Sequence, residues 1–112
     1  MDTTTGTVGK YILDDKGNPV ACFDLVKWAE WFEASQKNGA RAVAKTSIGD
    51  ITISTIFLAI DHSFVDKEGL PLLYETMVFG GNRDGDQERS ATKGQALQDH
   101  IDMIKLVLWD KE

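Results

Sequence analysis

The chain has 112 residues, of which 42% are hydrophobic and 27% charged, a composition typical of one soluble globular domain. Its net charge of −6 argues against a binder of duplex nucleic acid, which needs a basic face to displace counterions from phosphates. An acidic protein can still hold a small phosphorylated ligand, because a few Arg, Lys or backbone N–H groups suffice.

The first third of the chain predicts a tail, a strand and a helix. Its small polar start predicts a disordered tail over residues 1–9, followed by a single ligand-binding domain over residues 10–112. Apolar Tyr11–Leu13 predicts a strand. A turn rich in Asp, Gly and Asn follows it and leads to a second apolar segment. Asp24 is a typical N-cap and Asn38–Gly39 a typical helix end, so the segment between them predicts a helix.

The apolar residues of this helix recur at helical spacing. Leu25, Trp28, Ala29 and Phe32 fall at positions i, i+3, i+4 and i+7, which predicts one buried face. Trp31 lies at the edge of that face, so it either joins the core or is left free to stack on a base.

The rest of the chain predicts three strands and a second helix. Two strands meet at Ile48–Gly49–Asp50, and residues 72–80 form the third. Thr92 and Gln95 match a capping box at the start of the last helix. In that helix we expect one buried stripe, widened by Ala96, Met103 and Val107 and centred on Leu97, Ile101, Ile104 and Leu108. The order β-α-β-β-β-α predicts an α+β fold, in which two main helices pack an antiparallel sheet.

The sequence predicts no catalytic or metal-binding group. Asp61–His62–Ser63 cannot hydrogen-bond in series, because neighbours in an extended segment point to opposite faces. A solvated helix face explains His100 better than a metal site does. The alternating oxygen ligands of residues 82–88 resemble a calcium loop, but Gly85 and Lys93 stand at the wrong places. We therefore expect neither an enzyme nor a cofactor.

The cysteine content and the hydropathy of the chain indicate its cellular compartment. The single cysteine, Cys22, has no partner for an internal disulfide and is expected to be a small core residue. There is no signal-peptide pattern, and no apolar run approaches the roughly 20 residues of a membrane span. These features predict a cytosolic protein that does not insert into a membrane.

The end of the third strand carries the best candidate for a binding site. Phe79 is followed by Gly80 and Gly81, so an aromatic ring lies where backbone can approach a ligand closely. The polar segment beyond the ring is either an idle solvated connection or the rim of a site. Its donors suit phosphate and ribose oxygens, and they are Asn82, Arg83, Gln87 and Arg89.

Five segments follow one another in an order found in one group of phage proteins. They are KYILDDKGNPV, DLVKWAEWFE, VAKTSIGDITISTIFLAIDHSF, PLLYETMVFGG and DQERSATKGQALQDH. The most specific pieces are STIFLAIDHSF and YETMVFGG, and the likeness extends from Lys10 to about Val107. On these segments the chain resembles the first family of Thoeris anti-defence proteins.

The resemblance implies a non-enzymatic mechanism in the cytoplasm of a bacterial host. Such proteins sequester the cyclic ADP-ribose signal that an immune TIR-domain enzyme makes, so the downstream effector stays off. They form homodimers, some of which assemble into hexamers, and the signal binds where two subunits meet. Hexameric members have been linked to additional pockets for cyclic oligonucleotides.

The resemblance also implies positions for the ligand contacts. Phe79 corresponds to the ring that stacks on adenine, and a basic residue of the last helix corresponds to Lys105. Arg41 is a further candidate, and the polar segment after Phe79 maps to Gln87, Glu88 and Arg89. The chain departs from the family pattern at Asp86, where an aromatic is expected, at Glu88, whose charge would repel a pyrophosphate, and at Glu30, where the family helix tends to carry a basic residue.

Two other functions compete with this one. A phage inhibitor could bind a host protein directly, using an acidic surface as a decoy for a basic partner. A small hydrolase could degrade the nucleotide, but the sequence offers no nucleophile and base at usable spacing.

Overall fold

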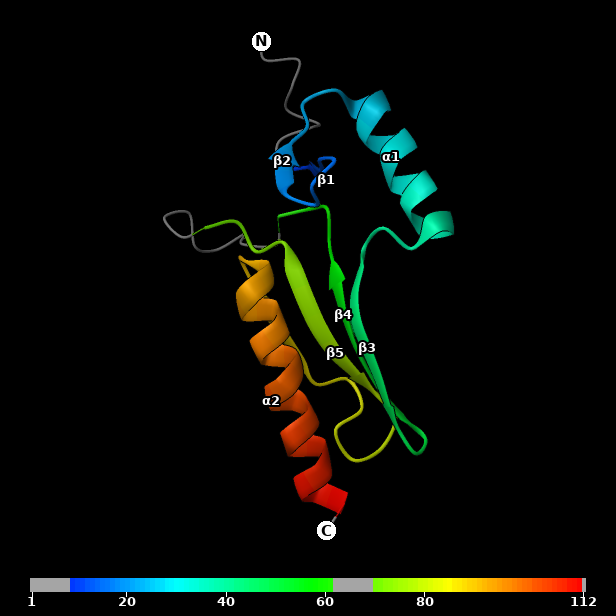
Figure 1. Ribbon diagram of the computed structural model, residues 1–112, viewed down its shortest axis with the longest axis vertical. Helices are drawn as coiled ribbons and strands as arrows, with labels where there is room; N and C mark the ends of the chain where they lie inside the picture. The colour runs from blue at the N-terminus through cyan, green and yellow to red at the C-terminus, as the bar shows by residue number, and fades with distance from the viewer. Residues whose placement is uncertain (1–8, 62–69, 112) are drawn as a thin grey trace.

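The computed structural model describes residues 9–61 and 70–111, and it has the α+β architecture that the sequence predicts (Figure 1). One antiparallel sheet has two strands in the order β1-β2, and the other has four in the order β3-β4-β5-β6. The predicted tail lies outside the described residues except for Gly9, and so do His62 and Ser63. In chain order the elements are β1 (Tyr11–Leu13), β2 (Pro19–Ala21), α1 (Leu25–Asn38), β3 (Ala42–Ile48), β4 (Ile51–Phe57), β5 (Tyr74–Phe79), β6 (Gln87–Ser90) and α2 (Lys93–Lys111).

Local chemistry fixes both ends of α1 as expected. The Asp24 carboxylate accepts a hydrogen bond from the backbone N–H of Lys27 at 3.1 Å. Gly39 adopts the left-handed conformation, with φ of +73°, and donates its N–H to the carbonyl of Ser35 at 3.1 Å. Cys22, just before the helix, is buried as predicted.

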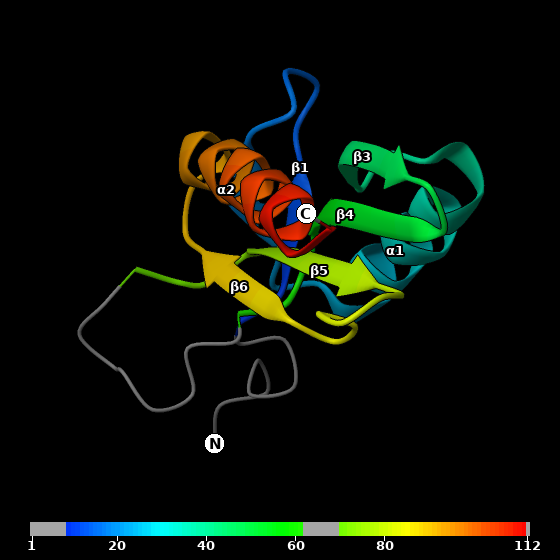
Figure 2. The ribbon, with the colours of Figure 1, turned by 90° about the horizontal axis from the view of Figure 1, so that it is seen from below.

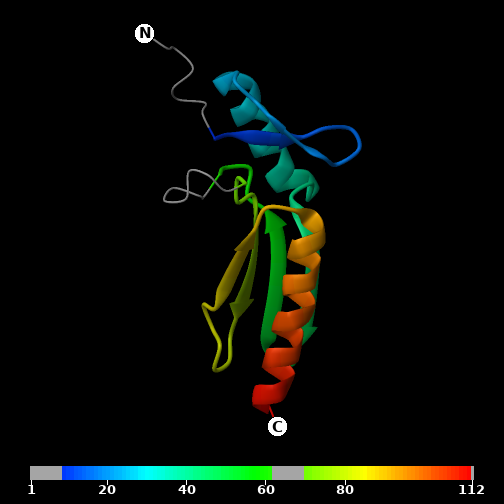
Figure 3. The same cartoon turned by 90° about the vertical axis from the view of Figure 1, so that its left-hand side faces the viewer.

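Helix α1 lies beyond one end of the four-stranded sheet, together with β1 and β2 (Figures 1 and 3). The indole N–H of Trp28 lies 3.1 Å from the carbonyls of both Tyr11 and Ala59, which anchors the helix to β1 and to the end of β4. Trp31 and Phe32 also pack on the buried cluster there, which comprises Phe57, Ala59, Leu73, Tyr74 and Ala96.

The predicted buried face of α1 is partly wrong. Leu25 and Ala29 are exposed, while Trp28, Trp31 and Phe32 are half-buried and Ser35 is buried. The reason is geometric: the helix meets only the end of the sheet, so its contact runs through the aromatic side.

The four-stranded sheet has one face toward α2, as Figure 2 shows. Ile53, Thr55 and Phe57 of β4 are fully buried on that face, beside Thr76 and Val78 of β5. Strand β6 was not predicted, because its sequence Gln-Glu-Arg-Ser lacks the alternation of a half-buried strand. It exists because it pairs with β5 at the sheet edge, where charged residues are tolerated.

Helix α2 begins at the predicted cap, since Thr92 Oγ1 accepts the N–H of Gln95 at 3.1 Å. The predicted centre of its buried stripe is wrong, because Leu97, Ile101 and Leu108 are 39%, 47% and 47% exposed. The residues that face the sheet are instead Ala96, His100, Met103 and Val107, all buried. No helix within residues 9–61 and 70–111 has both the length and the hydrophobicity that crossing a membrane requires.

The packing interface between α2 and the sheet is polar at its centre. His100 is only 5% exposed, so its interpretation as a solvated residue was wrong. Its Nδ1 lies 2.8 Å from Thr55 Oγ1 and its Nε2 lies 2.9 Å from Thr46 Oγ1. Thr55 in turn lies 2.6 Å from Thr76 Oγ1, so three strands and the helix share one hydrogen-bond network.

Candidate functional site

The face of the four-stranded sheet that points away from α2 is the most promising binding surface. Within the described residues no helix or strand covers it, as Figures 2 and 3 show. We call it the open face. Strand register and alternation place ten side chains on it, namely Lys45, Ser47, Thr52, Ser54, Ile56, Glu75, Met77, Phe79, Gln87 and Arg89.

Phe79 ends β5 on the open face and is 49% exposed. It pairs with Thr52 of β4, which in turn pairs with Ser47 of β3, so two hydroxyls extend in a row from the ring. Because Val78 points into the core toward α2, its neighbour Phe79 must point outward. A half-exposed ring with polar neighbours can stack on a planar base.

Gln87 and Arg89 share the open face with Phe79. Gln87 is paired with Met77 and lies one row from the ring, while Arg89 is paired with Glu75 and lies two rows away. These offsets correspond to roughly 7 and 14 Å along the strands. Arg89 Nε also forms an ion pair with Glu75 Oε2 at 3.1 Å, which orients the guanidinium and leaves its terminal nitrogens for another acceptor.

Glu88 points to the opposite face. It is paired with Thr76, which faces α2, and it lines a hollow with Asp99, Asp102 and two apolar residues of the helix. Glu88 is therefore not among the side chains that a pyrophosphate on the open face would contact.

The segment that connects β5 to β6 is held by its own hydrogen bonds. The N–H of Gly85 donates to the carbonyl of Val78 at 2.8 Å, and the Asp84 carboxylate accepts the N–H of Gly80 at 2.6 Å. Gly80 and Gly81 both have positive φ, and a Cβ on Gly81 would lie 2.7 Å from Ile51 Cδ1. These two glycines let the segment turn closely over the end of β4.

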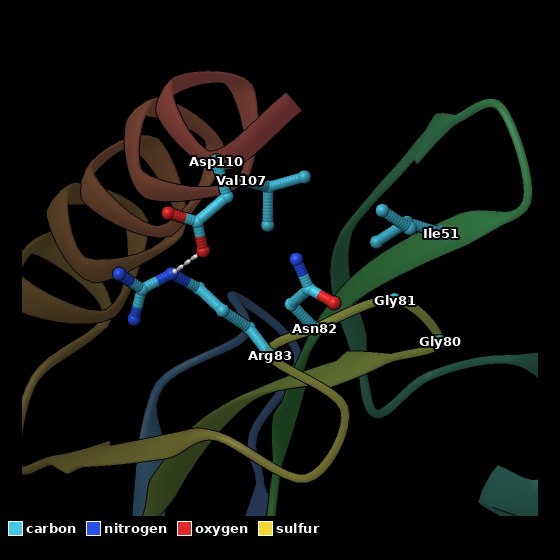
Figure 4. A pocket seen from close by; sticks show the side chains of 7 residues that line it. All are labelled: Ile51, Gly80, Gly81, Asn82, Arg83, Val107 and Asp110. Carbon is cyan, nitrogen blue, oxygen red and sulfur yellow. Dashed lines mark ion pairs between the residues drawn. The ribbon is translucent and has the colours of Figure 1, made fainter. Parts of the chain in front are cut away.

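A hollow of about 250 Å³ lies between this segment and the C-terminal end of α2 (Figure 4). Asn82 projects into it, and Ile51 and Val107 form its apolar walls. Arg83 reaches across to Asp110, with 2.7 Å from Nε to the carboxylate, and also pairs with Asp86 at 3.1 Å. Its hydrogen bond with Asp86 raises the pKa of Arg83, and the charge of Asp110 acts in the same direction.

The surroundings of Arg83 do not favour the phosphate contact that the sequence predicts for it. Two carboxylates already bind its guanidinium, so the mouth of this hollow carries more negative than positive charge. A phosphate group would meet repulsion there. Asn82 and Arg83 line a different surface from that of Phe79.

The remaining candidates lie elsewhere. Trp31 packs edge-to-face on the Phe57 ring, with 5.9 Å between centroids, so it belongs to the core. Arg41 stacks over the Phe32 ring at 4.3 Å and donates from Nε to Ser35 Oγ at 3.1 Å, and burial lowers the pKa of Arg41. Lys105 is exposed on α2, across the sheet from Phe79. One chain therefore brings together only Phe79, Gln87 and Arg89 from the predicted set.

Sequence reasoning missed several residues of the open face. Lys45, Ser47, Thr52 and Ser54 join Phe79 there, and Lys45 adds a cation on β3, two strands or roughly 10 Å from β5. The alternation of β4 was a usable signal, because Thr52 and Ser54 share one face of it. What was missing was the knowledge that α2 covers the other face.

The groups on this surface can stack on a planar ring and exchange hydrogen bonds. They comprise an aromatic ring, hydroxyl and amide groups, and two cations in other rows of the same face. Among the described residues, no group of three or more His, Cys, Asp or Glu side chains could hold a metal ion. Comparisons with family models, with curated proteins and with solved structures found no match for this chain.

Proposed function

We propose that this protein binds and sequesters a cyclic ADP-ribose-type nucleotide without cleaving it, as a phage protein that blocks TIR-based Thoeris signalling in the host cytoplasm. The observation that carries the proposal is the half-exposed Phe79 on the open face, which also carries Lys45 and Arg89. The resemblance of the sequence to anti-defence sponges supplies the ligand class, and the open face supplies a chemistry that suits it.

The chemical groups of the ligand match the open face in kind. An adenine ring can stack on Phe79, which is worth about 1–3 kcal/mol for a base on an aromatic side chain. The ribose hydroxyls can exchange hydrogen bonds with Thr52, Ser54 and Gln87. The pyrophosphate needs cations, and Arg89 and Lys45 are the two on this surface.

A flat sheet face does not enclose a nucleotide. Burial between two subunits would exclude water from the charged contacts and strengthen them. We therefore propose that the functional unit is a homodimer, with further assembly to a hexamer as an extension.

One experiment can distinguish sequestration of the nucleotide from its cleavage. The full chain is mixed with cyclic ADP-ribose isomers, passed through a desalting column and heated, and the released material is identified by mass spectrometry. Release of the intact nucleotide supports the proposal. Release of a hydrolysed product would indicate an enzyme, and absence of any retained nucleotide would refute sequestration.

A pair of variants then locates the site by calorimetry. Phe79→Ala is expected to weaken nucleotide binding roughly 5- to 150-fold, the range that corresponds to loss of one stacked base. Phe23→Ala is the matched control, because Phe23 is also exposed, at 62%, but precedes α1 at the other end of the molecule. Equal effects of the two variants would remove Phe79 from the site.

A second candidate function rests on the hollow lined by Glu88, Asp99 and Asp102. Three carboxylates on one side of α2 form an acidic surface that suits a basic partner, so we propose direct inhibition of a host protein as the alternative. Charge reversal at Asp99 and Asp102 would abolish that activity and leave nucleotide binding unchanged. The opposite result would favour the nucleotide.

A further inference from the structure

Helix α2 carries a second apolar stripe that nothing within the described residues covers. Its members are Leu97, Ile101, Ile104 and Leu108, spaced by four, three and four residues, which is the heptad spacing of a helix-pairing seam. Leu97, Ile101 and Leu108 are 39–47% exposed, and Ile104 is half-buried against the neighbouring core. Contiguous aliphatic side chains of this kind mark an interaction surface more often than an ordinary surface.

The stripe occupies one flank of the helix. At 100° per residue it lies about a quarter-turn from the buried residues Ala96, His100, Met103 and Val107. The opposite flank contains Asp99, Asp102 and Leu106, which line the acidic hollow beside β6. The stripe therefore faces the β3 side of the molecule.

Gly94 extends the same heptad by one position at the start of the helix. Glycine is unfavourable within a helix, and no atom lies within 4 Å of the place where a Cβ would stand. The chain itself thus gives no packing reason for a glycine here. A close approach by another helix would supply one.

We infer that this stripe binds the same stripe of a second copy of the chain, with the two α2 helices antiparallel. The proposed function supplies the expectation of a multi-subunit assembly. The stripe lies on the α2 side of the sheet, so it joins two subunits through a different contact from one that would enclose a nucleotide against Phe79. In this arrangement Leu97 of one copy meets Leu108 of the other, and Ile101 meets Ile104, so every aliphatic residue of the stripe has an aliphatic partner.

Charge favours the antiparallel pairing over the parallel one. Lys105 forms no ion pair with any described residue, and it lies on the solvent side of the stripe. A parallel pair would turn Lys105 toward the flank of the second helix that carries His100 and Val107, which is already buried against its own sheet. The antiparallel pair places it near the partner's Gln98 and Asp102, which favours attraction.

The area that two paired α2 helices would bury indicates how strong the dimer contact is. A helix of 19 residues is about 28 Å long. Two such helices in contact along their length bury on the order of 1,000 Å² in total, near the lower limit for a specific interface. The dimer is therefore expected to dissociate on dilution.

Sedimentation of the full chain over a range of concentrations tests the inference. The wild-type mass is expected to rise from 12.4 kDa toward twice that value, whereas Ile101→Glu remains at 12.4 kDa throughout. Leu106→Glu is the matched control, because Leu106 is 42% exposed on the opposite flank of the same helix, and it is expected to dimerise like wild type. Circular dichroism verifies that each variant is folded.

Two outcomes would overturn the inference. One is a wild-type chain that stays monomeric at every concentration, and the other is an Ile101→Glu chain that dimerises normally, which would assign the contact to another surface such as the free edge of β3. Neither depends on nucleotide binding. A dimer that ignores every nucleotide would refute only the proposed function. A monomer that captures nucleotide would refute this interface and the proposed homodimer, but not sequestration.

Cross-linking tests the orientation. Leu97→Cys chains mixed with Leu108→Cys chains are expected to form a mixed disulfide, because those positions face each other in the antiparallel pair. Two copies of Leu97→Cys are expected to remain unlinked, because their positions lie about 16 Å apart along the axis. Efficient linkage of Leu97→Cys to itself would refute the antiparallel arrangement.

Discussion

The buried His100 makes stability depend on pH in a way that can be worked out from its contacts. A neutral imidazole has one donor and one acceptor nitrogen, which suits the hydroxyls of Thr46 and Thr55. Protonation would turn both nitrogens into donors. It would also leave a positive charge on a side chain that is only 5% exposed. Burial accordingly lowers the pKa of His100 below its ordinary value of about 6.5.

The surroundings offer this charge little compensation. Asp99 and Asp102 of α2 accept hydrogen bonds from Gln95 and Gln98, and Glu88 faces the helix from β6 at the rim of the same acidic hollow. None of these carboxylates forms an ion pair with His100. Lys45 of β3 points to the open face, away from the ring.

The sign of the effect follows from comparing the folded and unfolded chains. Below pH 6.5 the unfolded chain binds a proton on this residue that the folded chain does not. The contribution of His100 is therefore complete above pH 6.5 and is lost as pH falls toward its lowered folded pKa. The free energy of unfolding should decline by at most about 1.4 kcal/mol per pH unit within that window.

The His100→Leu variant isolates this contribution. At pH 7.5 we expect it to be less stable than wild type by about 1–3 kcal/mol, because half-buried Thr46 and buried Thr55 each lose a hydrogen-bond partner. Urea unfolding, followed by tryptophan fluorescence, measures the difference at several values between pH 5.5 and 7.5. The gap should narrow toward pH 5.5, because only wild type is destabilised by protonating this side chain.

The comparison controls for other titrating groups. His62 is present in both chains, so its effect cancels. A gap that stays constant across the range would show that His100 does not titrate differently on folding. A gap that widens as pH falls would show that the folded state favours the charged ring, which contradicts the network described above.

Three further predictions concern stability, each measured by urea unfolding. Asp24→Ala should lower the free energy of unfolding by about 1 kcal/mol, since it removes the N-cap of α1. Gly80→Ala should cost more than Gly85→Ala, because both have positive φ but only Gly80 would place a Cβ 2.9 Å from the carbonyl oxygen of Asp50; equal losses would refute the close approach. Trp28→Phe should cost about 1–3 kcal/mol, since the carbonyls of half-buried Tyr11 and buried Ala59 lose their shared donor, and an unchanged midpoint would refute that role.

Local signals in the sequence were sufficient for the helix ends and the fold class. Asp24, Gly39 and Thr92 act through atoms within four residues of themselves, so their roles follow from composition and spacing alone. Strand β6 has no such signal, because its existence depends on the edge that β5 offers.

The face of α2 could not be predicted for a different reason. Two stripes, one centred on Leu97 and Ile101 and the other on Ala96 and His100, both satisfy helical spacing. The first is the more hydrophobic, and it is the one that the sequence predicts as the centre of the buried face. The second is the one buried against the sheet because its small and polar members fit the hydroxyls there, a complementarity that depends on Thr46 and other residues distant in sequence.

Which residues accompany Phe79 on the open face also depends on contacts between residues that are distant in sequence. Gln87 and Glu88 are adjacent in sequence but lie on opposite faces, and only the register of β6 against β5 decides which of them accompanies Phe79. A shift by one residue would have placed a carboxylate beside the ring.

Net charge is a poor guide to what this protein can bind, because its charges are segregated by the sheet. Carboxylates at Glu88, Asp99 and Asp102 gather on the α2 side, and Arg83 is neutralised by its acidic neighbours. The open face retains Lys45 and Arg89 against a single carboxylate. Since interactions between exposed charges are screened within about 10 Å, an anion on the open face responds to the cations beside it more than to the charge of −6 carried by the whole chain.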